Sequence, residues 1–333
     1  MDFANTTPFP AKLLSGSTGD REMVCIVAAK VTYSLQDGAL VPVVPAQSWP
    51  VFEKPFVFEG VTLAAETDFR KKGIDVLVFG KAMALNGTPV RQMVAGVECG
   101  KMRHFAAVFG DRAWRRSLAG GIQASEPAAF AEMALTNDRA FGGKAICSGQ
   151  ELPHPVNPDG KGFCMEKECA AGTPLPNLER TDGLIQGWKD QPRPACFFKP
   201  KGIPNMPAAK VKDLMEVIPG IVESSFNQAV PEMVSKPEEW GSTLRLAGFS
   251  VQGDILFPAP RLHGPTAHAS IGGRRSRFPS TLSTVVVLAP HRVLVATYLC
   301  LFRYLFSPLE KRSLELRWGE DPRVLPVKVT RKP

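Results

Sequence analysis

The fold class is decided by one apolar stretch, Leu282 to Phe306, which has the sequence LSTVVVLAPHRVLVATYLCLFRYLF. A transmembrane helix needs roughly 20 continuous apolar residues, and this stretch is interrupted by Pro290, His291, Arg292 and Arg303. β-Branched and aromatic residues dominate on both sides of the interruption, which favours two strands joined by a turn. The stretch therefore predicts a buried β-hairpin rather than a membrane span.

The N-terminal part of the chain shows the same strand character, broken by turn residues. The Asn86-Gly87 pair suits positive backbone φ angles, so we expect a hairpin with strands at 75–80 and 89–97. A third antiparallel strand at Phe105–Phe109 completes the predicted meander. Further strands are expected at Met23–Leu35, Ala39–Val44 and Phe56–Ala65.

Two short helices are expected. One is at Ser125–Leu135, where Ser125 can cap the helix, and the other is at Ala209–Val217. Strand character resumes after Trp240, which predicts a mainly β chain with short helices and an antiparallel β-sandwich-like domain in which distant strands pair. We expect one domain over residues 1–333, with an N-terminal β meander at 20–115, a loop-rich centre at 136–207 and a C-terminal β part at 240–330.

The centre of the chain, from Asp138 to Glu179, contains Gly, Pro and Asn without periodicity, which predicts irregular backbone. Aromatic anchors such as Phe141 favour an ordered loop, since a disordered linker has few of them. The Gly142-Gly143 pair allows close backbone approach, and Arg139 offers five N–H donors. We interpret this region as ordered loop structure that holds its own shape or holds a partner.

Composition is ordinary for a protein with a full core. Hydrophobic residues make up 44% and charged residues 22%, while 30 Pro and 29 Gly indicate many turns. The seven cysteines have no repeated spacing, and no apolar segment follows a basic start, so we expect a reduced, cytoplasmic protein without membrane insertion. The net charge of +8 leaves open nucleic-acid binding through two arginine clusters, Arg112, Arg115 and Arg116, and Arg274, Arg275 and Arg277.

A hydrolase or metalloenzyme is the other alternative. Its candidate residues are His263 with His268, and Cys164 with Cys169, near His154, Cys147 and Cys196. The two central cysteines are farther apart than the pairs of structural zinc sites, and no nucleophile elbow accompanies the histidines. Glu66, Asp68 and Asp75 could form an acid–base set, but Asp75 opens a strand, and Glu66 and Asp68 lie in a turn, where carboxylates commonly bond backbone amides. We therefore expect no metal, no cofactor and no catalytic residues.

Six phrases occur in the same order as in a known bacterial family. They are Glu66–Arg70 with Lys72–Val76, Val108–Arg112 with Trp114, Arg139–Gly143, Asn157-Pro158 with Gly160 and Gly162-Phe163, Leu175–Glu179, and Phe226-Asn227 with Ala229 and Pro231. With these phrases the chain resembles a domain of unknown function that is encoded beside the valine-glycine repeat spike protein VgrG in type VI secretion clusters. The resemblance covers most of the chain.

The resemblance implies a non-enzymatic adaptor or chaperone. Such a protein binds a toxic effector in the producing cell and helps to load it onto the VgrG spike. Membrane insertion is not expected, and a protein rather than nucleic acid is the expected direct ligand. The residues that we predict to bind a partner or to order the loops are Arg112, Trp114, Arg139, Phe141, Gly142, Gly143, Asn157, Phe163, Asn177, Phe226 and Asn227.

Overall fold

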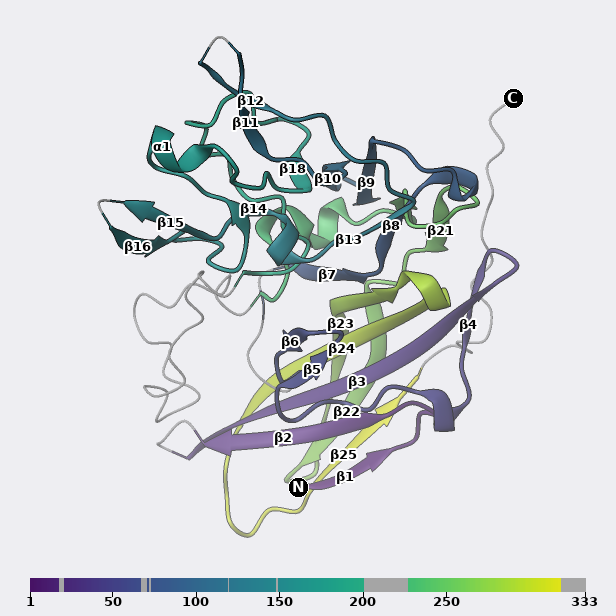
Figure 1. Ribbon diagram of the computed structural model, residues 1–333. Helices are drawn as coiled ribbons and strands as arrows, with labels where there is room; N and C mark the ends of the chain where they lie inside the picture. Colours follow the sequence, from purple (N-terminus) through teal and green to yellow (C-terminus); the bar gives the residue numbers. More distant parts are fainter. Residues whose placement is uncertain are drawn as a thin grey trace.

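The computed structural model describes residues 1–17, 21–66, 71, 73–118, 120–147, 149–200 and 227–318. Two large sheets dominate this part of the chain: a ten-stranded sheet in the lower half of Figure 1 and a five-stranded sheet in the upper half. Among the described residues the only α-helix is the four-residue α1, Lys167–Ala170. The mainly β, sandwich-like fold that the sequence predicts is confirmed.

The ten-stranded sheet is built around the longest strands. Its hydrogen-bonded path runs β1, β25, β22, β23, β24, β3 and β2, while β4, β7 and β19 attach beside this path. Neighbours are antiparallel, except that β1 with β25 and β7 with β23 are parallel. The strands are β1 Asp2–Asn5, β2 Ala11–Ser17, β3 Glu22–Gln36, β4 Ala39–Pro42, β7 Ile74–Phe79, β19 Val234–Ser235, β22 His263–Ile271, β23 Arg274–Leu288, β24 Val293–Leu305 and β25 Arg312–Arg317.

The late apolar stretch forms the predicted hairpin. β23 and β24 pair with each other, and the 3-10 helix η8, Ala289–His291, joins them at the interruption seen in the sequence. Arg292 follows with a left-handed φ of 52°, which lets the chain reverse. β24 then pairs with β3 along its whole length, so two long and largely apolar strands lie side by side.

A register shift interrupts β23 between Leu282 and Thr284. Before the shift β23 pairs with β22 as far as Thr281, and after it β23 pairs with β7 on the same edge. The shift is therefore the place where one neighbour ends and the next begins. Bulges of this kind bend a strand and redirect its side chains.

The five-stranded sheet has the order β18, β10, β9, β20 and β21, and all its neighbours are antiparallel. Its centre is the β9–β10 hairpin, which confirms the prediction that a strand at Phe105–Phe109 pairs with the one before it. The strands are β9 Gln92–Cys99, β10 Met102–Phe109, β18 Leu178–Arg180, β20 Thr243–Ala247 and β21 Ile255–Pro258.

One hydrophobic cluster joins the two sheets. Val97 and Val108 from the five-stranded sheet and Val285 and Leu294 from the ten-stranded sheet belong to it, and each of these side chains is buried. A smaller cluster, which includes Val27, lies among strands of the ten-stranded sheet. Burial of each large aliphatic side chain stabilises the fold by about 1.5–3 kcal/mol, so these clusters are the main force that holds the sheets together.

The predicted hairpin of 75–80 and 89–97 is wrong. β7 pairs with β23 and β19, whereas β9 pairs with β10 and β20. All six β7 residues are buried, and a strand buried on both faces needs partners inside a large sheet. Asn86 has the expected positive φ of 55°, but it lies in the 3-10 helix η2, Leu85–Gly87. Residues 56–65 form two short strands, β5 Phe56–Phe58 and β6 Val61–Leu63, rather than one.

The predicted helix at Ser125–Leu135 is also wrong. Phe130 forms a bridge with Val90, and the strand β13, Glu132–Ala134, pairs with β8, Lys81–Met83. The Ser125 hydroxyl accepts the backbone N–H of Ala113 at 3.1 Å instead of capping a helix. Pairing with a neighbouring segment thus outweighs a weak local helix preference. The helix predicted at 209–217 lies outside the described residues.

Two small two-stranded ladders lie in the loop-rich centre: β14 Phe141–Gly142 with β17 Lys161–Gly162, and β15 Lys144–Cys147 with β16 Gln150–Pro153. A third precedes the centre and pairs β11 Trp114–Arg116 with β12 Ile122–Ala124. The β11–β12 and β15–β16 ladders project from the upper half of the molecule in Figure 1. In the part of the chain that the structure describes, no helix has the length and apolar character needed to cross a membrane.

Candidate functional site

Asn177 connects three of the sequence phrases at one buried side chain. Its Nδ2 donates to the Phe109 carbonyl at 3.0 Å and to Asp111 Oδ1 at 3.0 Å. Its Oδ1 accepts a hydrogen bond from Arg139 Nη1 at 3.1 Å. The backbone adds two bonds, because the Asn177 N–H donates to the Arg139 carbonyl and the Phe109 N–H donates to the Asn177 carbonyl, each at 2.8 Å. We call this set the Asn177 cluster.

A buried ion pair lies beside the Asn177 cluster. Arg112 Nη2 contacts Glu179 Oε1, and the side chains are 8% and 1% exposed. The Arg112 guanidinium also lies 3.8 Å from the centre of the Phe109 ring, an arrangement that favours a cation. The second Glu179 oxygen accepts the Ile185 N–H at 2.8 Å. Trp114, two residues farther along the chain, is buried as well, and its backbone forms hydrogen bonds with the backbone of Gly172 and Thr173.

Asn157 fixes the glycine-rich phrase. Its Nδ2 donates to the Phe141 carbonyl at 3.1 Å, and its backbone N–H donates to His154 Nδ1 at 3.1 Å. Its carbonyl accepts the Gly143 N–H at 2.8 Å. Gly142 has φ of 143°, and a Cβ placed there would lie 2.1 Å from the Asn157 carbonyl oxygen, so only glycine fits.

The aromatic residues of the loop-rich centre pack around the same phrase. The Phe141 ring is 2% exposed and meets His154 edge to face at a centroid distance of 5.4 Å. Phe163, which is half-buried, meets His154 at 5.1 Å and Phe141 at 6.4 Å. Apart from half-buried Arg139 and Phe163, the predicted site residues of this centre are largely enclosed, and their contacts join loop segments to one another.

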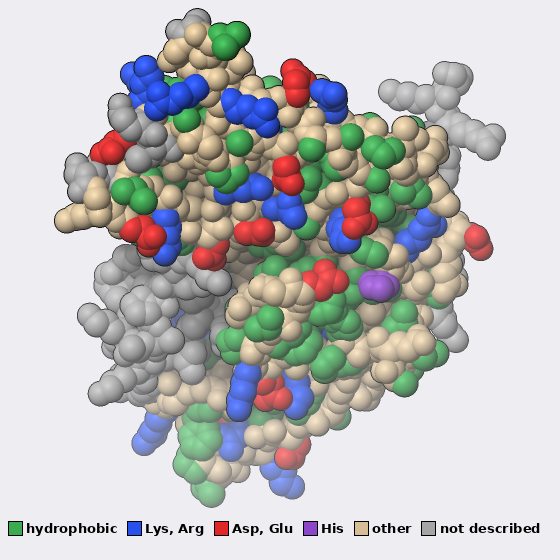
Figure 2. All heavy atoms as spheres, in the orientation of Figure 1, with side chains coloured by type: hydrophobic (Ala, Val, Ile, Leu, Met, Phe, Trp, Pro, Cys, Tyr) green, Lys and Arg blue, Asp and Glu red, His purple; other side chains and the backbone are tan. Residues whose placement is uncertain are grey.

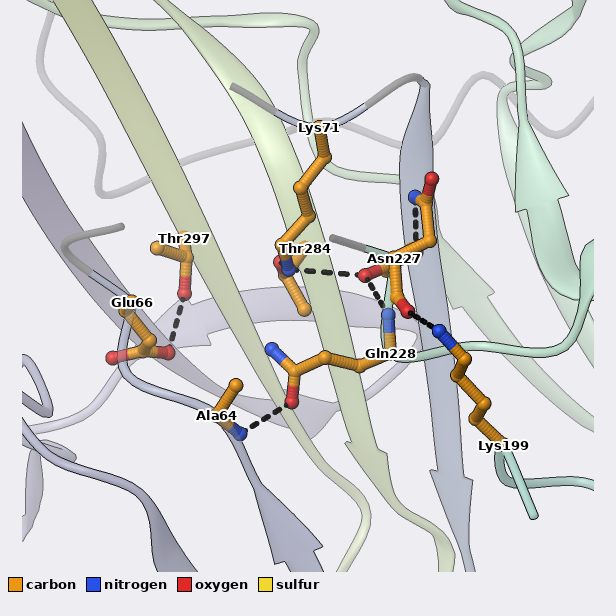
Figure 3. A network of polar contacts seen from close by, with 9 residues as sticks. Ala64, Glu66, Lys71, Lys199, Asn227, Gln228, Thr284 and Thr297 are labelled. Carbon is orange, nitrogen blue, oxygen red and sulfur yellow. Dashed lines mark hydrogen bonds and ion pairs between the residues drawn. The ribbon is translucent and has the colours of Figure 1, made fainter. Parts of the chain in front are cut away.

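A second polar cluster surrounds Asp75, which is fully buried on β7. Figure 3 labels four of the residues in this cluster, Lys71, Asn227, Gln228 and Thr284. Its Oδ2 accepts hydrogen bonds from Lys71 Nζ at 3.0 Å and from the Gln228 N–H at 2.9 Å. Its Oδ1 accepts one from Asn227 Nδ2 at 2.6 Å. Lys71 Nζ also donates to Thr284 Oγ1 at 2.7 Å. Two phrases that are far apart in the sequence, 66–76 and 226–231, therefore meet at one carboxylate. Phe226, which belongs to the second phrase, lies outside the described residues.

Glu66 extends the Asp75 cluster onto the centre of the ten-stranded sheet. Its Oε1 accepts the Thr297 hydroxyl at 3.1 Å, as Figure 3 shows, and its Oε2 accepts the Phe52 N–H at 3.0 Å. The Glu66 carboxylate also forms an ion pair with Lys30, whose side chain is 1% exposed. Burial lowers the pKa of Lys30 to about 8, while the negative charge of Glu66 acts in the opposite direction.

Sequence reasoning missed the two buried lysines. Lys30 interrupts the apolar run of β3, and a charge in such a run signals a buried ion that needs a partner. The sequence predicts that Glu66 lies in a turn and bonds a backbone amide, and Glu66 does accept the Phe52 N–H. Asp75, which is predicted to open a strand, accepts the Gln228 N–H. Each also pairs with a buried lysine, Lys30 or Lys71, which the sequence interpretation did not include. Asp68 lies outside the described residues.

The two clusters lie within a segment that matches one protein family. Residues 20–298 match the family described as an uncharacterized protein conserved in bacteria (DUF2169). The chain belongs to this family. The DUF2169 segment contains all six phrases, both polar clusters and most strands of both large sheets. Searches of curated proteins and of solved structures found no match to the chain.

The residues of the hydrolase and metal alternatives are dispersed in this DUF2169 protein. Cys164 is buried, and its Sγ lies 3.1 Å from the Glu166 carbonyl, whereas the side chain of Cys169 lies outside the described part. His263 begins β22 as an exposed residue, and His268 lies farther along the same strand. Among the described side chains, no group of three or more His, Cys, Asp or Glu residues is arranged to hold a metal ion.

The two arginine clusters differ in structure. The Arg112 side chain is buried in an ion pair with Glu179, whereas Arg115 and Arg116 are exposed. Arg112 therefore does not share a surface cluster with the other two. The other three arginines, 274, 275 and 277, are all exposed at the start of β23. On the face in Figure 2, blue and red side chains are interspersed over the upper half of the molecule, so charge there is mixed.

His104 gives the fold a predictable dependence on pH. It is 4% exposed, packs against Phe197 at a ring distance of 4.8 Å, and burial lowers its pKa from 6.5 to about 4. The folded pKa lies below the unfolded value, so the unfolded state binds more protons between these two values and stability falls as the pH falls through this window. From pH 7 to pH 4.5 we expect the His104 contribution to the free energy of unfolding to fall by about 2 kcal/mol.

Urea unfolding at both pH values checks this expectation. His104→Phe keeps an aromatic ring and removes the titration, so the variant should lose about 2 kcal/mol less than the unsubstituted protein over the same interval. An equal loss in the two proteins contradicts the assignment.

Proposed function

We propose that this protein is a non-enzymatic adaptor of type VI secretion, which binds a toxic effector in the producing cell and helps to load it onto the VgrG spike. The sequence resemblance supports the proposal, because the six phrases occur in the order found in effector adaptors. The structure adds a physical basis, because the polar residues of those phrases hold the loop-rich centre in one conformation.

The observation that carries the proposal is the set of apolar side chains exposed on this ordered framework. Ile146 and Leu152 on the β15–β16 hairpin are 57% and 39% exposed, and Met165 and Leu184 are 47% and 42% exposed. Single exposed apolar residues are common on protein surfaces. Here they lie on loops that are already ordered, so binding a partner requires little further loss of conformational entropy. An adaptor surface needs both exposed apolar side chains and loops that are ordered before the partner binds.

Co-expression tests the proposed function. The tagged chain is produced with the product of each gene that neighbours its own, and separately with VgrG, and the retained proteins are measured after affinity purification. We expect the effector to co-purify in a fixed ratio and to accumulate to a higher level than when it is expressed alone. If the folded chain retains neither protein, the proposal is wrong.

A matched pair of variants localises the effector contact. Ile146→Asp places a charge on the exposed β15–β16 hairpin, and we expect at least a tenfold loss of effector retention. Val57→Asp is the control, because Val57 is 68% exposed on β5 and lies outside the loop-rich centre. Both variants should unfold at the same urea concentration as the unsubstituted chain.

A further inference from the structure

A cavity of about 310 Å³ opens beside the register shift of β23. Three neighbouring strands and Pro237, the first residue of a 3-10 helix, supply its apolar lining, and the residues just before β7 supply a polar side. The lining includes Ile26 from β3, Leu299 and Leu301 from β24, Pro279 from β23, and Lys71 and Gly73. A volume of this size is at the lower end of ligand pockets and accommodates one large apolar side chain.

Lys71 gives the cavity a hydrogen-bond donor. Its side chain is 8% exposed, and its ammonium donates to Asp75 Oδ2 and to Thr284 Oγ1. An ammonium has three N–H donors, so its contacts with the described residues leave one for a group that enters the cavity. Because Asp75 already balances the lysine charge, a neutral acceptor such as a peptide carbonyl fits this position better than a second anion.

Two arginines lie on the face of β23 that borders the cavity, nearer to the start of the strand. Side chains alternate along a strand, so Arg275 and Arg277 lie on the face that carries Pro279. Both arginines are exposed, and neither has a carboxylate within ion-pair distance among the described residues. Successive side chains on one face are about 7 Å apart, the same repeat as in an extended peptide. Across β22, His268 lies opposite both Arg277 and Glu315, and Glu315 is paired with Arg317.

We propose that this surface binds an extended acidic segment of a protein partner. One apolar side chain of the segment enters the cavity, and carboxylates two and four positions away contact Arg277 and Arg275. Guanidinium groups suit carboxylates because they can donate two parallel hydrogen bonds. The described lining of the cavity favours protein over nucleic acid, since among the described residues its apolar members are aliphatic or proline and none offers an aromatic ring for base stacking. We call it the Arg275 surface, and its relevance to secretion rests on the proposed function.

A peptide assay tests the Arg275 surface directly. The probe is a fluorescent nine-residue peptide with leucine at its centre and glutamate two and four positions away on both sides, so its direction of binding does not matter. We expect the full-length protein to bind it at least tenfold more tightly than a peptide with lysine in place of glutamate or alanine in place of leucine. Equal binding of the three peptides overturns the proposal.

Variants and a nucleic-acid probe complete the test. Arg275→Glu with Arg277→Glu should weaken peptide binding at least tenfold, and so should Leu301→Asp, which changes a residue that is 43% exposed. Arg115→Glu with Arg116→Glu changes two exposed arginines elsewhere and should leave the affinity unchanged. Unchanged binding by the first two variants, or tighter binding of a single-stranded DNA oligomer than of the acidic peptide, overturns the proposal.

The adaptor assay separates this inference from the proposed function. If the unsubstituted chain retains effector or VgrG and the Arg275→Glu, Arg277→Glu variant retains the same amount, the Arg275 surface is not the contact and the adaptor function stands. If the unsubstituted chain retains neither partner, the adaptor function fails, and the peptide affinities alone decide whether the surface binds acidic segments.

Discussion

Asp75→Asn is expected to lower the free energy of unfolding by about 3–5 kcal/mol, because it leaves a buried charge without its partner. The Asp75 carboxylate is fully buried and pairs with Lys71, whose side chain is 8% exposed. Asparagine has nearly the same volume, so little of the loss arises from packing. Its amide group would also present N–H donors where Asn227 and the Gln228 backbone now donate.

Urea unfolding followed by tryptophan fluorescence measures this loss. Glu132→Gln is the matched control, since Glu132 pairs with Lys81 on the surface with both side chains about half exposed. Surface pairs of this kind contribute between about 0 and 1 kcal/mol. The double variant Lys71→Met, Asp75→Asn should lose less than the single variant, because no unpaired ammonium remains. A loss below about 1 kcal/mol for Asp75→Asn is inconsistent with a buried ion pair.

Asn177→Asp is expected to lower the free energy of unfolding by about 3 kcal/mol, because the loop-rich centre depends on the two donors of one amide. The Asn177 Nδ2 group serves the Phe109 carbonyl and Asp111 Oδ1, and both distances are 3.0 Å. A carboxylate in its place faces two oxygens and can donate to neither. Arg139 can offset only part of the cost of this negative charge. Its guanidinium donates to the Oδ1 position of residue 177 at 3.1 Å, whereas the lost donors are those of Nδ2.

Two measurements distinguish local from global effects of Asn177→Asp. Urea unfolding reports the total loss, and limited proteolysis reports whether cleavage begins within residues 138–179, as expected when the loops lose their shared anchor. Asn86→Asp is the control, because Asn86 is exposed and aspartate tolerates its positive φ. The control should change stability by less than about 0.5 kcal/mol. Equal effects of the two substitutions contradict the role assigned to Asn177.

The sequence predicts those parts of the fold whose partners are close along the chain. The β23–β24 and β9–β10 hairpins are of this kind, since a turn separates two strongly apolar segments. The position of β7 could not be derived in the same way, because its parallel partner β23 is about 200 residues away and local turn signals carry no information about it. The extended backbone near Phe130 likewise depends on its bridge to Val90.

In the candidate site, too, some features could be predicted from local sequence, and others depend on residues that are distant along the chain. The phrase at 139–143 could be selected from its residue types and from its resemblance to known sequences, and its glycines meet the close contacts expected of them. The meeting of Asp75 with Asn227 and of Glu66 with Lys30 could not be predicted, because it depends on how β7 and β3 are placed in the ten-stranded sheet. Spacing along the sequence does not encode such meetings.

The order of the strands in the ten-stranded sheet has a consequence for synthesis of the chain. β3 lies between β2 and β24, and β1 has its pairing partner in β25, with Asn5 opposite Leu316. Other contacts also join distant parts of the chain: the hydrogen bond from Asn227 to Asp75, for example, connects residues that are 152 positions apart. Contacts of such separation form slowly, and the N-terminal strands leave the ribosome long before their partners exist. An incomplete chain therefore exposes unpaired strand edges until β25 has been synthesised, and exposed edges of this kind are the sites at which strands of different chains can pair and aggregate.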